Sequence, residues 1–147
     1  MASTPQAAPA VDVEYLKLIQ GVVDRLAQNS FHAKSWSVGM AAAILTVGTI
    51  SQRSQASVLA FFPAICFCLL DAYYLRRERL FRALYDAAVR ADAPRFCLDT
   101  RPFEGPATSW GSVLRSPAIL LAHIPIVAVI ALVIATSLIL NLMKGAG

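Results

Sequence analysis

The sequence predicts an all-α integral membrane protein with three transmembrane helices, an N-terminal amphipathic helix and a long second span that projects into the cytoplasm. Hydrophobic residues make up 57% of the 147 residues and charged residues only 15%. Soluble domains have about 45–50% and about 25% of these classes. The additional hydrophobic residues lie in long uncharged segments. A chain of this length forms one domain.

The first segments lie outside the predicted membrane part. Residues 1–10 are small, polar and proline-bearing, which predicts a disordered tail. Residues 11–29 place apolar and polar positions at helical spacing, and their charges nearly balance. We therefore expect an amphipathic helix that packs on another protein helix, with the membrane surface as the alternative. The pair at 29–30 predicts a cap that starts a separate helix. The apolar stripe of this segment comprises Leu16, Ile19, Val23 and Leu26.

The first predicted span covers residues 31–52. Lys34 is its last charge, and the next 18 residues are uncharged. Trp36 stands where an interfacial aromatic belt is expected. Gly39 and Ala43 have the small-xxx-small spacing that permits close helix contact. The polar turn that follows, residues 51–55, is short enough to force the flanking spans into an antiparallel hairpin.

The second span is predicted as one helix over residues 56–92. At about 1.5 Å per residue it is about 55 Å long, whereas the hydrocarbon core is about 30 Å thick. Its apolar half ends at Asp71, and a run of arginines follows. Arginine side chains prefer the interface, so this run is expected to mark the exit from the bilayer and to contact lipid headgroups. The arginines are Arg76, Arg77, Arg79 and Arg82.

Beyond the arginines, the projecting helix carries a second apolar stripe. Exposed to water, this stripe would be an aggregation risk. We expect it to pack against the stripe of residues 11–29, within one subunit or across neighbouring subunits. A contact with its own copy in another subunit is the alternative. The side chains are Leu80, Phe81, Leu84 and Tyr85.

The remaining segments complete the topology. Residues 93–115 contain three prolines and no periodic pattern, which predicts a cytoplasmic loop that folds back on the headgroups through its aromatic residues. Residues 116–143 are uncharged and predict the third span. Arginine and lysine concentrate before the first span and between the second and third. The positive-inside rule therefore places the N-terminus in the cytoplasm and the C-terminus on the periplasmic or extracellular side.

Asp71 and His123 are the candidates for an intramembrane polar site. A carboxylate near hydrocarbon must face protein or water, and its predicted partners are His123, Arg76 or Arg77. Either an ion or proton relay or an interfacial anchor would use such a residue, and the anchor is favoured because titratable groups are few. The histidines and the three cysteines show no metal-ligand spacing, and no catalytic motif occurs. We therefore expect no enzyme activity and no cofactor.

Two stretches carry a resemblance to known proteins, residues 14–31 (EYLKLIQGVVDRLAQNSF) and residues 70–86 (LDAYYLRRERLFRALYD). Together they resemble a widespread group of small bacterial inner-membrane proteins of uncharacterised function. The arrangement is also similar to the SLATT membrane effector modules of phage-defence systems, in which a membrane hairpin continues as a cytoplasmic helix. The third span here departs from that layout.

This resemblance implies a location in the bacterial inner membrane and a role as an oligomeric effector or pore-forming module. The alternative is a non-enzymatic anchor or scaffold subunit that holds a cytoplasmic or membrane protein partner. The expected partners are membrane lipid and further copies of the chain. The net charge of +4 lies beside apolar runs, so orientation and anionic lipid account for it and nucleic acid is not needed as a partner.

Overall fold

The structure is a computed structural model that describes residues 12–51, 57–90, 92–94 and 96–145. The predicted tail (residues 1–10) lies outside the described residues, as does most of the turn at 51–55. The all-α prediction is confirmed, because the described part contains helices and no strand. In chain order the elements are α1 (Val13–Ile50), α3 (Phe61–Val89), the 3-10 turns η1 (Arg101–Phe103) and η2 (Pro106–Thr108), α4 (Trp110–Leu114) and α5 (Pro117–Gly145).

Helix α1 is continuous where the sequence predicted two helices. It begins after Asp12, whose side chain accepts hydrogen bonds from the backbone N–H groups of Glu14 and Tyr15. The predicted cap at Ser30 is wrong, because Ser30 faces inward and its hydroxyl bonds another helix. One buried stripe with spacings of mostly three or four runs the length of α1, so tertiary packing continues the helix through this point. The stripe comprises Tyr15, Ile19, Val23, Ser30, Ala33, Ser37, Ala41, Leu45 and Gly48.

Helix α3 is shorter than the predicted span of residues 56–92. A helical turn at residues 57–58 breaks at 59–60, and α3 then begins at Phe61. Pro63 therefore lies in the first turn of α3, where its missing N–H removes no intrahelical hydrogen bond. The sequence had placed this proline inside a helix. At the other end α3 finishes at Val89, ahead of the predicted end.

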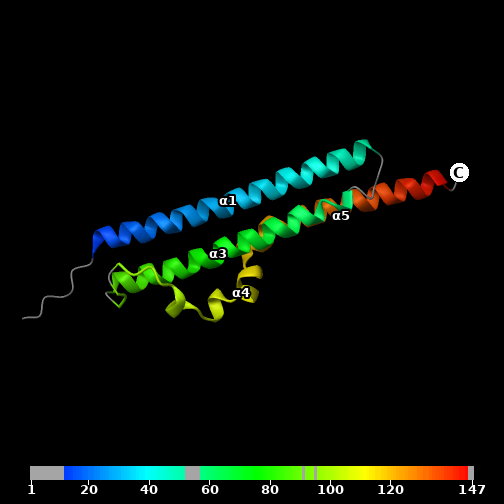
Figure 1. Ribbon diagram of the computed structural model, residues 1–147. Helices are drawn as coiled ribbons and strands as arrows, with labels where there is room; N and C mark the ends of the chain where they lie inside the picture. Colours follow the sequence, from blue (N-terminus) through cyan, green and yellow to red (C-terminus); the bar gives the residue numbers. More distant parts are fainter. Residues whose placement is uncertain (1–11, 52–56, 91, 95, 146–147) are drawn as a thin grey trace, which may run out of the picture.

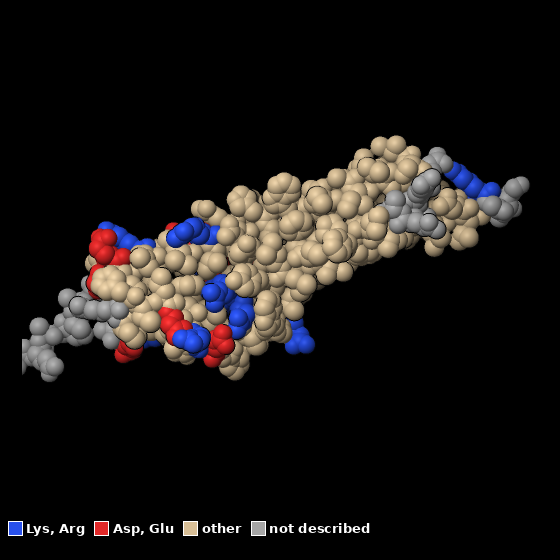
Figure 2. Space-filling model, viewed as in Figure 1, with Lys and Arg blue, Asp and Glu red and all other residues tan. Residues whose placement is uncertain are grey.

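The helices form an elongated bundle with two chemically different halves. Helices α1 and α3 run antiparallel and form a hairpin (Figure 1). Helix α5 extends beside the half of this hairpin that contains its turn, and the C-terminus of the chain lies at that end. Charged side chains gather over the other half, around the start of α1 and the end of α3 (Figure 2). We call the charged half the stalk (residues 12–29, 76–90 and 96–115). The apolar bundle is residues 35–50, 61–70 and 117–143.

The surface of the apolar bundle is made of large exposed hydrophobic side chains. Phe62 is 73% exposed, Leu121 77% and Val47 64%, and each comes from a different helix. Soluble monomers rarely expose a contiguous apolar surface of this extent. Two of the described helices, Val13–Ile50 and Pro117–Lys144, are long and apolar enough to cross a membrane.

The hairpin is tightest near its turn, where Gly48 meets Ser57. A Cβ atom placed on Gly48 would lie 2.4 Å from Ser57 Oγ and 3.1 Å from its backbone nitrogen, whereas a Cβ on Gly39 would meet nothing within 4 Å. We therefore expect Gly48→Leu to force the helices apart and to destabilise the hairpin by about 1–3 kcal/mol. Gly39→Leu is the matched control and should leave stability nearly unchanged. Thermal unfolding of both variants in detergent checks this prediction. An equal loss of stability in the two variants would contradict a close contact between Gly48 and Ser57.

Candidate functional site

A buried polar network joins the three long helices where the stalk meets the apolar bundle. Asp71 of α3 is fully buried at its centre. From α1, the Ser30 hydroxyl donates to Asp71 Oδ1 at 2.5 Å, and the Lys34 ammonium donates to the same oxygen at 2.7 Å. From α5, His123 Nε2 lies 3.1 Å from Asp71 Oδ2. Both carboxylate oxygens therefore have donors, which is how a carboxylate is stabilised at such a site.

The hydrogen-bond roles in this network follow from the geometry. The carboxylate accepts, so the imidazole carries a proton on Nε2, and the buried Nδ1 has no partner among the described residues. The negative charge of Asp71 is paired with the Lys34 ammonium at 2.7 Å. A buried carboxylate that is both ion-paired and hydrogen-bonded is compatible with apolar surroundings.

The structure brings Asp71 and His123 together, as the sequence predicted, but the other two predicted partners, Arg76 and Arg77, do not bond Asp71. Arg76 donates to the Thr108 carbonyl at 2.8 Å and forms an ion pair with Glu104 at 3.0 Å. Arg77 is half-buried on α3. Ser30 and Lys34 were not predicted as partners of Asp71, because Ser30 was expected to start a separate helix. If residues 13–50 are taken as one helix, Ser30 and Lys34 lie one turn apart on the side of the helix that carries the buried stripe.

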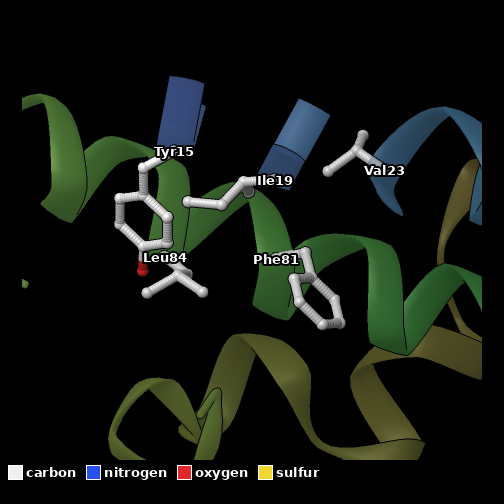
Figure 3. Close-up of a cluster of buried hydrophobic side chains, with 5 residues drawn as sticks. All are labelled: Tyr15, Ile19, Val23, Phe81 and Leu84. Carbon is white, nitrogen blue, oxygen red and sulfur yellow. The ribbon is translucent and has the colours of Figure 1, made fainter. Parts of the chain in front are cut away.

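The predicted contact between the two apolar stripes forms the core of the stalk, within one chain (Figure 3). Ile19 and Val23 of α1 meet Phe81 and Leu84 of α3, and each of these side chains is at most 9% exposed. Leu26 and Tyr85 pack at the edge of this cluster. Leu80 is fully buried and Leu16 half-buried, but neither belongs to it.

Tyr15 is a member of the stalk core that the sequence analysis missed. Its ring is 3% exposed, and its hydroxyl donates to the backbone carbonyl of Cys97. Burial raises the pKa of the Tyr15 phenol, and the nearby Cys97 adds to the effect. The Phe96 ring lies beside Tyr15, and Phe103 packs on the core, so both residues contact the stalk core.

Two of the four arginines predicted to bind headgroups, Arg76 and Arg79, hold the loop to α3. Arg79 donates to the Ala107 carbonyl at 3.1 Å, and Arg82 pairs with Glu78 at 2.7 Å one turn earlier on α3. The Arg76 guanidinium also lies 5.8 Å from the centre of the Trp110 ring. Ser109 caps α4 by accepting from the Ser112 backbone N–H. These contacts make the segment before α5 an ordered part of the stalk.

Aromatic side chains are exposed at the level of the polar network. Trp36 follows Lys34 by two residues and is 62% exposed, and Tyr73 follows Asp71 by two residues and is 42% exposed. Trp110, at the start of α4, is 47% exposed. Amphipathic rings of this kind concentrate at membrane–water interfaces. The level of Asp71 therefore has the composition of such an interface.

The described residues contain no cluster of three or more metal-ligating side chains. His32 is exposed beside Phe31, whereas His123 is buried against Asp71, so the two histidines have different surroundings. Comparison of the chain with family models, with curated proteins and with solved structures gives no match.

Proposed function

We propose that the chain is an integral protein of the bacterial inner membrane, with α1, α3 and α5 as its three spans. The exposed apolar surface of the bundle supports this, because lipid is the solvent that such a surface requires. Helix α3 is not among the described helices that are long and apolar enough by themselves, because its apolar part, residues 61–70, is short and Asp71 and the arginines follow it. Both α1 and α5 pack against α3. The aromatic residues around Asp71 mark the cytoplasmic interface of this arrangement, and the stalk extends beyond it into water.

Two cysteine substitutions test this topology after Cys66, Cys68 and Cys97 are replaced. Gln28 is exposed on the stalk, and Ser51 is exposed at the opposite end of α1. A membrane-impermeant maleimide should label Ser51→Cys in intact cells and Gln28→Cys only after the inner membrane is opened. Labelling of Gln28→Cys in intact cells would reverse the proposed orientation. Recovery of both variants in the soluble fraction would exclude membrane insertion.

We infer that the role of the protein is that of a non-enzymatic membrane anchor or scaffold for a cytoplasmic partner. The observation that carries this is the closed stalk: the stripes of α1 and α3 cover each other, and the loop is fixed on α3 by Arg76 and Arg79. A stalk of this kind presents a surface rich in charged side chains (Figure 2). The Asp71 carboxylate supports a non-catalytic role, because it is buried and all its donors come from the chain itself.

Purification in mild detergent tests the anchor role. A stoichiometric heterologous partner is expected, and it should protect Gln28→Cys on the stalk from the maleimide while Ser51→Cys remains reactive. Protection of both positions, or of neither, would contradict docking on the stalk. The second variant is a matched control because its cysteine lies at the other end of the same helix.

An oligomeric effector or pore-forming module, of the kind found in anti-phage defence, is the second candidate function. It is favoured by the small residues Gly39 and Ala43, which are exposed on the outer face of α1 where another chain can approach closely. Overexpression should then depolarise cells, and Gly39→Leu should abolish depolarisation without preventing insertion. Normal membrane potential with the protein inserted would exclude this candidate.

A further inference from the structure

An elongated groove lies between α3 and α5 on the surface of the apolar bundle. Its volume is about 430 Å³, and its lining is almost wholly apolar. Leu114 of α4 lines the end nearest the stalk, while Ala64 of α3 and Ala131 of α5 line the deep end. Small residues at the deep end leave this space open, because alanine side chains do not fill the gap between the two helices.

The shape of the groove fits a hydrocarbon chain. Along α5 its lining extends from Ile119 to Ala131, which corresponds to about 18 Å of helix. It is open along one side, so a chain that lies parallel to the helices can enter it from the bilayer. Within the apolar bundle the solvent is lipid, and a groove with this lining offers few groups that a polar ligand can bond.

A basic residue lies next in sequence to the lining at the stalk end of this groove. Arg115 directly follows Leu114 and ends α4. It is exposed, and it has no ion-pair or hydrogen-bond partner among the described side chains, in contrast to Arg76 and Arg82. Its guanidinium lies along α4, since a Cβ placed on Gly111 would be 3.7 Å from Arg115 Nη1. An unpaired guanidinium at the interface presents two parallel donors, the arrangement that binds phosphate oxygens best.

We propose that the groove between α3 and α5 is a binding site for an anionic phospholipid, with one acyl chain along α5 and the phosphate on Arg115. This inference rests on the membrane insertion proposed above and goes beyond it by naming a site and a lipid class. The acyl chain is common to all phospholipids, so the groove supplies affinity without discrimination. Discrimination in favour of a net negative headgroup comes from Arg115.

Native mass spectrometry of the full chain tests the site. The protein is released from nanodiscs of equal phosphatidylglycerol and phosphatidylethanolamine with identical acyl chains, and the retained lipid is counted. We expect phosphatidylglycerol to be retained preferentially, and Arg115→Gln to reduce that preference about fivefold. Ala128→Phe, which fills the groove, should reduce retention of both lipids.

Two control variants make the test specific. Arg25→Gln removes an exposed charge from the stalk, and Ala135→Phe adds the same ring to the same face of α5 two turns beyond Ala128, outside the groove. Neither should change lipid retention. Equal retention of the two lipids, or an unchanged preference in Arg115→Gln, would overturn the proposed site while the protein remains inserted. Failure of all variants and of the parent chain to enter nanodiscs would instead refute membrane insertion itself.

Discussion

Replacing Asp71 by leucine is expected to destabilise the bundle by about 3–5 kcal/mol, because it removes one member of a buried ion pair. The Lys34 ammonium would lose the carboxylate that lies 2.7 Å away, and His123 Nε2 and the Ser30 hydroxyl would lose their acceptor. The lower end of the range is expected, since the Lys34 side chain is 28% exposed and retains some contact with solvent. Thermal unfolding of the parent chain and of Asp71→Leu in detergent measures this loss of stability.

A second substitution separates a broken ion pair from a general loss of packing. The double variant Asp71→Leu with Lys34→Leu removes both charges, so most of the lost stability should return. Asp86→Leu is the control on the same helix, because Asp86 is exposed on the stalk and its loss should change stability by less than about 0.5 kcal/mol. A double variant as unstable as Asp71→Leu would show that the ion pair is not what holds this junction.

Truncation of Leu84 to alanine should destabilise the stalk by about 2–5 kcal/mol. Leu84 is 1% exposed in the cluster with Ile19 and Phe81, so the truncation leaves a cavity that its neighbours fill only in part. Leu18→Ala is the matched control, since Leu18 lies on α1 in the same stalk and is 47% exposed. It makes the same chemical change without leaving a cavity.

The readout for this pair should be local to the stalk. Hydrogen exchange of the amides in residues 13–29 and 80–89 is expected to accelerate in Leu84→Ala, while exchange in α5 stays as in the parent chain. Proteolysis of the segment after α3 should increase in parallel, because Phe103 packs on the same cluster. Equal acceleration in Leu18→Ala and Leu84→Ala would mean that the cluster does not carry the stability of the stalk.

These expectations bear on the choice between the two candidate roles. The apolar stripes of the stalk were the sequence-level reason to expect contacts between subunits, and the structure covers them within one chain. What remains available on the stalk is a surface rich in charged side chains, with exposed apolar residues such as Phe96 and Leu98 among them, which suits a soluble partner. What remains available in the bundle is apolar and includes the small residues Gly39 and Ala43, which suit another membrane helix. The proposed experiments address these surfaces separately.

Periodicity and charge were sufficient to predict the helical class and the meeting of the two stripes. Spacings of three and four place Ile19, Val23, Phe81 and Leu84 on single helix faces, and a short connection makes the helices antiparallel. The helix boundaries were less predictable. Ser30 has the chemistry of a cap, and only the position of Asp71 on the neighbouring helix makes it an inward-facing donor.

The sequence by itself determined which residues must avoid water and which must not enter lipid, because transfer free energy is a property of each side chain. It therefore determined the helical class, the apolar and charged halves, and the need of Asp71 for partners. The tertiary structure decided which partners: Lys34 lies 37 positions before Asp71 and His123 52 positions after it. Contacts at such separations depend on the register and rotation of the helices. Close packing at positions such as Gly48 sets both, and no local sequence pattern encodes them.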